Sequence, residues 1–342
     1  MSEAELGLLR DNAARFAEQC AGLGLIGRKP YDEGQRAAWL KALAAGSWTG
    51  LRADEAVGGM ELSCLDLTVV LEQFGRKLLP ISAPLLASAG LLHAGVPDAS
   101  GVLEGRAMVL PGLQSAGLRP SPGHGSKLEE VGGALRLSGS KHAIPDAAHA
   151  QGFIVDVKYA GKLALVYLPR DAVDLSAATL VDGHESADIR FDGVTIAPDQ
   201  IMAQGADADA LLDRLRFAVQ IGLAAETLGA AAEVFDRTLD YLRTRRQFGR
   251  TLGAFQALQH RAVDAYADIE LARALIMEAA RLADGGRPGM LELIAAARAR
   301  AGEMALRTAK WAVQMHGAMG FTDESDIGLF LKRIMVLTRV YR

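Results

Sequence analysis

The strongest local pattern in this 342-residue sequence reads Tyr241-Leu242-Arg243-Thr244-Arg245-Arg246-Gln247-Phe248-Gly249-Arg250, followed by Phe255-Gln256-Ala257-Leu258-Gln259-His260. Four arginines and three glutamines gather here, around a predicted helix end and the start of the next helix. Guanidinium groups bind phosphate through paired hydrogen bonds, and an aromatic ring such as that of Phe248 can stack on a flat ligand. The same cations can instead complement the dipole of a solvated helix end. The pattern alone leaves both interpretations open.

A second pattern near the C-terminus reads Gln314-Met315-His316-Gly317-Ala318-Met319-Gly320-Phe321. An amide followed by glycines at a helix end allows a ligand to meet exposed backbone. An ordinary glycine C-cap produces the same residue pattern.

Two further glycine patterns have a structural and a ligand-related interpretation. Gly123-His124-Gly125-Ser126 is a plain turn, or a loop that offers backbone N–H groups to a phosphate. The small residues Gly222, Ala224, Ala225 and Gly229 favour close helix packing over the lining of a ligand channel.

Composition excludes several classes of protein. The chain is 50% hydrophobic and 23% charged, which is typical of a globular protein. Its net charge of −4 argues against nucleic acid or an anionic membrane as an obligatory partner. Two cysteines form no disulfide framework, and the seven histidines show no metal-ligand spacing. No apolar run approaches a membrane span, and the acidic Met1-Ser2-Glu3-Ala4-Glu5 resembles no secretory signal, so we expect a cytoplasmic protein.

The residue pattern changes twice along the chain, which predicts an α+β protein of three domains. Residues 1–105 read as a helical N-terminal domain, residues 106–204 as a middle β-domain, and residues 205–342 as a C-terminal four-helix bundle. The bundle helices are predicted over 208–243, 252–284, 289–316 and 325–340. Strands are predicted over 134–139, 153–157 and 163–168, with a hairpin turn at Asp192-Gly193.

Together, the two C-terminal patterns resemble the signatures of the acyl-CoA dehydrogenase family. The resemblance extends to the N-terminal third, through Trp48-Thr49-Gly50-Leu51, Gly58-Gly59 and the run Leu65-Asp66-Leu67-Thr68-Val69-Val70-Leu71-Glu72. It implies the three-domain fold, FAD as cofactor and α,β-dehydrogenation of an acyl-CoA thioester. In that reaction a glutamate removes the α-proton, the flavin accepts the β-hydride, and an electron-transfer flavoprotein takes up the electrons.

The resemblance also implies which residues hold FAD. In the family, the adenine-diphosphate half of FAD is held across a dimer interface by the neighbouring subunit. The matching positions here are Arg245, Phe248 and Gln256 in the first signature, and Gln314 and Gly317 in the second. The one departure is Ala318, where the family has a second glycine.

The positions that match the family's catalytic glutamate carry no base. Counting from Gln314 leads to Tyr341, or to Arg342 with one inserted residue, and the sequence ends before the family's Gly-Thr. The alternative position, on the helix before Tyr241, is Val219. The catalytic residue is therefore unknown, and a relocated base would be Glu226 or Glu324.

The positions that match the family's flavin-ring contacts also differ. The glycine-rich motif reads Arg119-Pro120-Ser121-Pro122-Gly123-His124-Gly125-Ser126-Lys127, and Pro145 stands where a threonine bonds the ring. We therefore expect a subunit that completes the FAD site of a homologous partner in a heterotetramer, as in bacterial steroid side-chain degradation. The alternatives are a self-sufficient homo-oligomer with a relocated base, and a flavin-free structural or acyl-CoA-binding subunit.

Overall fold

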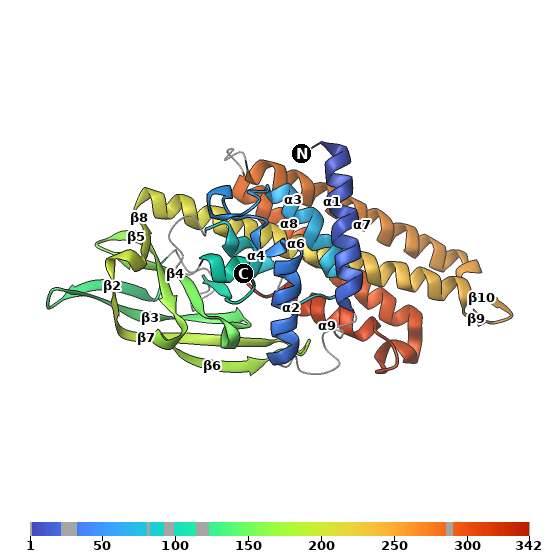
Figure 1. The fold of residues 1–342 in the computed structure, drawn as a ribbon. Helices are drawn as coiled ribbons and strands as arrows, with labels where there is room; N and C mark the ends of the chain where they lie inside the picture. Colours follow the sequence, from blue (N-terminus) through green and yellow to red (C-terminus); the bar gives the residue numbers. More distant parts are fainter. Residues whose placement is uncertain are drawn as a thin grey trace.

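The computed structural model describes residues 2–21, 33–80, 83–91, 99–113, 123–284 and 290–341. Figure 1 shows a β-sheet at one end of the molecule and long helices that extend to the other end. The main helices are α1 (Glu3–Ala21), α2 (Glu33–Ala45), α3 (Cys64–Arg76), α4 (Ala83–Ala89), α5 (Ala99–Leu103), α6 (Ala206–Thr244), α7 (Gln256–Ala283), α8 (Met290–His316) and α9 (Ile327–Leu337). Helices thus precede and follow the strands, which confirms the predicted α+β architecture.

The sheet has the strand order β6-β7-β3-β2-β4-β5-β8, and β1 pairs with β4 in parallel. Its strands are β1 (Val109–Gly112), β2 (Ser126–Val131), β3 (Ala134–Pro145), β4 (Gly152–Tyr159), β5 (Lys162–Pro169), β6 (Asp174–Thr179), β7 (Glu185–Ile196) and β8 (Ile201–Gln204). Strand β4 lies in the interior of the sheet, between β2 and β5, and its residues 152–157 are buried on both faces. The three predicted strands lie within β3, β4 and β5.

The prediction of a hairpin turn at Asp192-Gly193 is wrong. Both residues lie inside β7, which continues to pair with β3 on either side of them. The register shifts there, because Leu137 pairs with Val194 whereas Gly139 pairs with Phe191. Gly193 has a φ of 61°, so it supplies the left-handed residue of a β-bulge rather than that of a turn.

Helix α6 is the central element of the helical layer and runs for 39 residues. It crosses α3 with a glycine on each helix at the contact. A Cβ atom at Gly229 would collide with the carbonyl oxygen of Glu72, and one at Gly75 with that of Glu226. The small residues of α6 therefore serve packing, which confirms the structural interpretation.

The same helix meets the length and composition criteria of a membrane span, although its charged residues interrupt every long apolar run. In the fold, 89% of its most apolar 18-residue window is buried, so these apolar side chains belong to the protein core. The other bundle helices lie close to their predicted ranges; α7 begins at Gln256 and α9 ends at Leu337.

Candidate functional site

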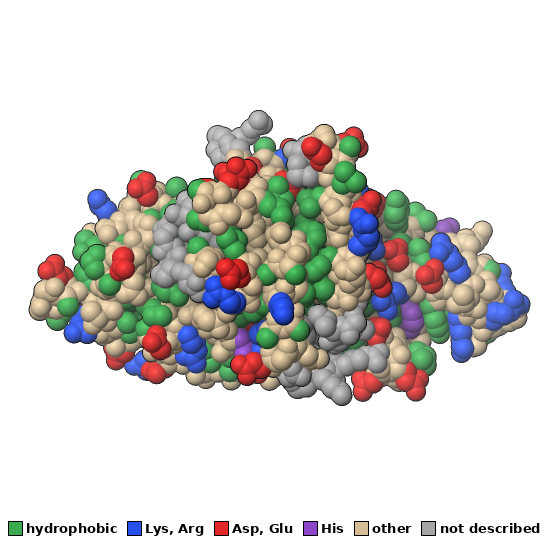
Figure 2. Space-filling model, viewed as in Figure 1, with side chains coloured by type: hydrophobic (Ala, Val, Ile, Leu, Met, Phe, Trp, Pro, Cys, Tyr) green, Lys and Arg blue, Asp and Glu red, His purple; other side chains and the backbone are tan. Residues whose placement is uncertain are grey.

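The five predicted FAD-contacting residues are exposed and lie toward one end of the helical layer. Arg245 caps the C-terminus of α6, and Gln256 is the first residue of α7. Gln314 belongs to the last turn of α8, and Gly317 follows that helix with a φ of 60°. We call Arg245, Phe248, Gln256, Gln314 and Gly317 the helical-end surface. Figure 2 shows Lys and Arg side chains gathered at the end of the molecule that carries β9 and β10 in Figure 1.

A short hairpin presents Phe248 at this end. Strands β9 (Arg246–Gln247) and β10 (Arg250–Thr251) are joined by Phe248 and Gly249, with φ values of 53° and 78°. Two left-handed residues are typical of a type I′ turn, and the glycine adopts this conformation without strain. Phe248 is 88% exposed and has an edge-to-face contact with Phe255, at 6.3 Å between ring centroids.

An aromatic stack links the two signatures, although they are distant in the sequence. The rings of Tyr241 and His316 are stacked, with centroids 4.2 Å apart. Tyr241 lies one helical turn before Arg245, and its carbonyl accepts the Arg245 N–H at 2.8 Å. His316 lies between Gln314 and Gly317, and its Nδ1 is 2.9 Å from the carbonyl oxygen of Ala312. Burial lowers the pKa of His316, so the stacked ring favours its neutral form.

The helical-end surface lies far from the sheet of the same chain. Helix α6 begins shortly after β8 and ends at Thr244, directly before Arg245, and its 39 residues span roughly 58 Å. Figure 1 shows β9 and β10 at the opposite end of the molecule from β2 to β8. Pro145, the sheet position that matches a flavin-ring contact, borders the same small void as Glu226, and the 19 residues from Glu226 to Arg245 span roughly 28 Å.

A cavity of about 620 Å³ lies between α6, α8 and the end of the chain. Its lining includes Val219 and Tyr341, the two described positions at which the family resemblance places a base. Val219 has no ionisable group. Tyr341 is buried and donates its hydroxyl to the carbonyl oxygen of Pro111 at 2.9 Å. Burial, reinforced by the charge of Asp146, raises the pKa of Tyr341, so this hydroxyl cannot act as a base near neutral pH.

Three arginines and one glutamate are the charged residues, among those described, that line this α6–α8 cavity. Arg216, Arg298 and Arg339 reach it, and Arg298 donates to the carbonyl oxygen of Leu337. Among the described residues, Glu303 is the one carboxylate on the cavity wall, and it lies on the exposed side of α8. The cavity thus suits an anionic ligand with an apolar portion better than it suits proton abstraction.

Neither proposed relocated base lines this cavity. Glu226 is 1% exposed and its Oε1 accepts from Arg333 Nη2 at 2.5 Å. Glu324 is exposed in the segment between Phe321 and α9. Arg342 lies outside the described residues.

Arg333 also pairs with Asp182 at 3.1 Å, and Asp182 contacts His184 at 3.0 Å. Burial alone would raise the pKa of Asp182, but His184 and Arg333 hold it well below its usual range. Burial alone would lower the pKa of Arg333, but Glu226 and Asp182 raise it. Glu226, Arg333, Asp182 and His184 form what we call the junction network, because it joins α6, α9 and the β6–β7 connection. No local motif in the sequence indicates these long-range pairings.

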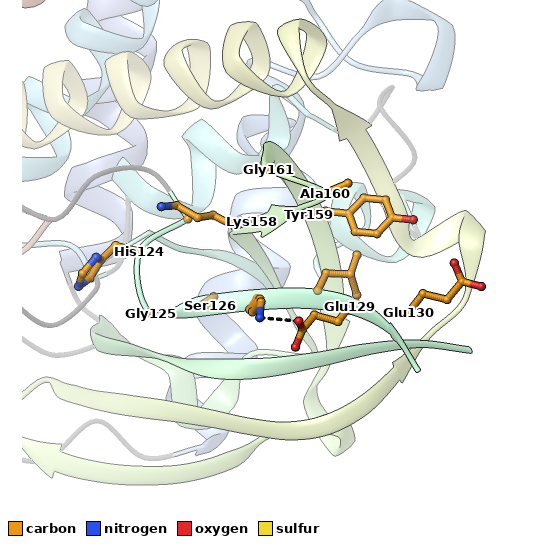
Figure 3. Close-up of a pocket in the computed structure, with 12 residues that line it drawn as sticks. His124, Gly125, Ser126, Glu129, Glu130, Lys158, Tyr159, Ala160 and Gly161 are labelled. Atoms are coloured by element: carbon orange, nitrogen blue, oxygen red, sulfur yellow. Dashed lines mark ion pairs between the residues drawn. The ribbon is translucent and has the colours of Figure 1, made fainter. Parts of the chain in front are cut away.

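The loop Gly123-His124-Gly125-Ser126 borders a shallow groove between β2 and the β4–β5 turn (Figure 3). The N–H of Gly123 donates to Asp156 Oδ2 at 2.6 Å. The buried Asp156 also pairs with Lys141, at 2.7 Å, and with Arg216, at 3.6 Å. This N–H therefore meets an internal carboxylate rather than a phosphate, as expected of a structural turn. Residues 119–122 of the matching motif lie outside the described residues.

Comparisons with known proteins agree with this architecture. The family model described as "Acyl-CoA dehydrogenase, C-terminal domain" matches residues 214–342. Acyl-CoA dehydrogenase IpdE2 of Mycobacterium tuberculosis (strain ATCC 25618 / H37Rv) is 28% identical over 337 residues, which cover 96% of this chain and 90% of that protein. The structure of a variant of the Tcur3481-Tcur3483 steroid ACAD superposes with a TM-score of 0.85 at 26% identity, covering 98% of this chain and 93% of that one.

Residues 214–342 thus match the C-terminal domain of the acyl-CoA dehydrogenase family, and nearly the whole chain is similar to acyl-CoA dehydrogenases. Another relative is 3-sulfinopropanoyl-CoA desulfinase of Paraburkholderia xenovorans (strain LB400). It is 27% identical over an alignment that covers 92% of this chain and 88% of that protein. The relatives of this chain therefore carry names of more than one reaction, so a relative's name alone does not establish the chemistry of this chain.

Pro145 marks another departure from the acyl-CoA dehydrogenase pattern. It ends β3 and pairs with Ser186 of β7. It lines a void of about 20 Å³ together with Asp146, His184 and Glu226. Proline has neither an N–H nor a hydroxyl group, so this position cannot donate a hydrogen bond to a flavin ring.

Proposed function

We propose that this chain is a subunit of an FAD-dependent acyl-CoA dehydrogenase that completes the FAD site of a homologous partner. In the proposed assembly, Arg245, Phe248, Gln256, Gln314 and Gly317 hold the adenine-diphosphate half of the partner's FAD. The partner supplies the flavin-ring contacts and the glutamate. FAD, when bound, accepts the β-hydride of an acyl-CoA thioester.

The observation that carries this proposal is the separation along α6. The helical-end surface lies roughly 28 Å along α6 from Glu226, which borders the same void as Pro145 of the sheet, and a separation of this size supports a site shared between two chains. The helical-end surface fits the cofactor: its guanidinium and amide groups and an aromatic ring are exposed and point out of the fold. The side near the sheet fits it less well, because Pro145 offers no donor and Tyr341 already donates to Pro111.

The chain's own residues then have two tasks. Arg245 binds phosphate oxygens through the paired N–H groups of its planar guanidinium, while Phe248 and Gln314 contact the adenosine portion of FAD. The α6–α8 cavity binds without catalysis, because the base positions Val219 and Tyr341 line it and neither can take a proton. We further propose a steroid acyl-CoA as the substrate class, supported by the relative named a steroid ACAD and by the size and apolar walls of the cavity.

The test begins with the colour of the purified protein. Alone, the chain should hold FAD at well below one per subunit and turn over acyl-CoA poorly. Co-purified with a longer relative, it should yield a yellow, active complex whose electrons pass to an electron-transfer flavoprotein. Stoichiometric FAD in the lone chain, with robust dye-linked activity, would favour a self-sufficient enzyme, and Glu303→Gln would then test the carboxylate on the cavity wall.

Arg245→Ala provides the sharper measurement. A hydrogen bond to a charged group contributes roughly 1.5–3 kcal/mol, so FAD should bind the assembled complex about ten- to 150-fold more weakly. Arg243→Ala is the matched control, because Arg243 is exposed on the same helix end but pairs with Asp240 at 3.0 Å. Equal FAD affinity of the wild-type and Arg245→Ala complexes would remove the main support for the proposal.

A further inference from the structure

A serine, a histidine and an aspartate are hydrogen-bonded in sequence on one face of the sheet. The Oγ of Ser140 is 3.1 Å from His142 Nε2, and His142 Nδ1 is 3.0 Å from Asp188 Oδ2. Ser140 and His142 lie two residues apart in β3, so their side chains share a face. The intervening Lys141 is fully buried on the other face. The three groups therefore lie on the solvent-facing side, away from the α6–α8 cavity.

A β-bulge orients His142 toward Asp188. The pairing of β3 with β7 shifts between Lys141 and Ile144, and Ala143 has a φ of 50°. The N–H of Ala143 donates to Asp188 Oδ1 at 2.8 Å, so both carboxylate oxygens are engaged. Bulges are frequent where a strand redirects a side chain, and a non-glycine residue in this region is strained.

The hydrogen bonds define the direction of proton transfer. An ionised carboxylate only accepts, so in the neutral imidazole Nδ1 carries the hydrogen toward Asp188 and Nε2 accepts the hydroxyl proton of Ser140. Burial alone would raise the pKa of Asp188, but the hydrogen bonds from Ala143 and His142 lower it, which keeps the carboxylate ionised. This is the order of roles in a Ser-His-Asp triad, which is recognised by geometry rather than by sequence position.

A positive group and a recess accompany the three residues. Arg190 is the direct cross-strand partner of Ser140, so the two side chains start about 5 Å apart on the same face. Ser140, His142, Asp188 and Arg190 all line one open recess of about 630 Å³, whose walls also carry Asp174 and Asp192. A guanidinium beside the nucleophile can stabilise the negative oxygen of a tetrahedral intermediate.

We propose that Ser140 is a nucleophile toward small carboxylic esters and thioesters that enter this recess. Its Oγ attacks the carbonyl carbon while His142 takes the hydroxyl proton. The carbon–oxygen or carbon–sulfur bond then breaks, and His142 returns the proton to the leaving alkoxide or thiolate. Water, deprotonated by His142, then attacks the acyl carbon, the bond from that carbon to Ser140 Oγ breaks, and His142 returns the proton to Oγ as the carboxylic acid leaves. The sequence of steps needs no oxidant or reductant and does not depend on the proposed FAD function.

Ser138 provides an internal control on the same face of β3. Its Oγ contacts Asp192 Oδ1 at 3.3 Å and accepts the N–H of Gly193 at 2.9 Å. It shares the strand, the recess and a nearby carboxylate, but its hydrogen-bond partners among the described residues, Asp192 and Gly193, include no histidine. If exposure alone made a serine reactive on this surface, Ser138 and Ser140 would react alike.

The experiment is labelling of the full chain with a fluorescent fluorophosphonate, combined with hydrolysis of p-nitrophenyl acetate. Peptide mass spectrometry should locate the label on Ser140. Ser140→Ala should lower the labelling rate at least tenfold, and Ser138→Ala should leave it unchanged. His142→Gln removes the general base and should slow labelling by about 10²–10⁴-fold. Asp188→Asn should slow it at least tenfold, because an amide no longer enforces the tautomer.

Thermal melts of each variant establish that the fold is retained, and Ser140→Ala removes only one half-buried hydroxyl. Labelling of wild type and Ser140→Ala at the same rate would overturn the proposal. So would equal rates for wild type and His142→Gln, or a label on Ser138.

Discussion

Around Thr244, where α6 ends, side chains face solvent, whereas in the middle of the same helix Glu226 is 1% exposed and ion-paired. Charged groups occur in both regions, but only in the middle do they have strong partners inside the fold. Phe248, 88% exposed on a hairpin tip, contributes little to the core of this chain. Charge alone therefore does not identify a functional surface. A buried charge with internal partners stabilises the fold, whereas an exposed aromatic ring beside exposed arginines indicates a partner outside it.

Arg333→Met should have the largest effect on stability. It leaves Asp182 and Glu226 as buried carboxylates without their shared cation, a loss that typically costs 3–5 kcal/mol. The free energy of unfolding, from urea denaturation, measures it. Arg237→Met is the control, because Arg237 pairs with Glu233 and Asp326 near the surface and should cost about 1 kcal/mol or less. Similar losses for both variants would contradict the distinction between the two regions.

Acid should lower the free energy of unfolding by less than Arg333→Met does, because it neutralises one charge of the junction network, the carboxylate of Asp182. The pKa of Asp182 in the folded protein lies below its unfolded value of about 3.9. Its contribution is therefore fully present above about pH 4 and is lost as the pH falls toward the folded pKa. Urea denaturation between pH 6 and pH 3 should show this loss, and Asp182→Asn should flatten it. An unchanged slope in the variant would assign the acid effect to other groups.

Gly229→Ala should cost about 1–3 kcal/mol, the usual range for overpacking. The added Cβ collides with the backbone of Glu72, and a backbone cannot rotate away as a side chain can. Gly7→Ala is the matched control: its Cβ meets open space in α1, and replacing a mid-helix glycine should stabilise by roughly 0.5–1 kcal/mol. Thermal melts of both variants give the comparison, and equal shifts would argue against a close crossing of α3 and α6.

Phe248→Ala should change the stability of the lone chain by less than about 0.5 kcal/mol, because the ring is almost entirely exposed. In the assembled complex it should weaken FAD retention, since the proposed stacking surface is lost. Fluorescence titration of FAD into the apo-complex, beside melts of the lone chain, measures both quantities. A marked loss of lone-chain stability would mean that Phe248 serves the fold of this chain after all.

Much of the helical architecture could be predicted from the sequence. The long periodic segments around 208–243 and 289–316 became α6 and α8 with shifts of only one or two residues. Helix periodicity is a local property, so it survives without knowledge of tertiary contacts. The predicted hairpin turn at Asp192-Gly193 is wrong because a glycine with positive φ fits a β-bulge as well as a hairpin turn. Only the pairing of β7 with β3 distinguishes the two.

The candidate sites depend more strongly on distant contacts. The five residues of the helical-end surface were proposed from two motifs, and their role in holding FAD stays a prediction. The pairing of Arg333 with Asp182 joins positions 151 residues apart, and that of His142 with Asp188 joins positions 46 apart. Neither spacing has a local signature, because both contacts arise from packing and strand register rather than from a motif.

The unbroken course of α6 couples angle to length. Each residue of an α-helix advances the chain by about 1.5 Å and turns it by about 100°. Deleting one residue between Gly229 and Arg245 would barely shorten the molecule, yet it would rotate Arg245 and Phe248 by more than a quarter of a circle relative to the crossing with α3 and to Gln314 of α8. Natural length variation in this part of α6 is therefore expected to be confined to whole turns, because any other change would aim the same side chains at a different neighbour.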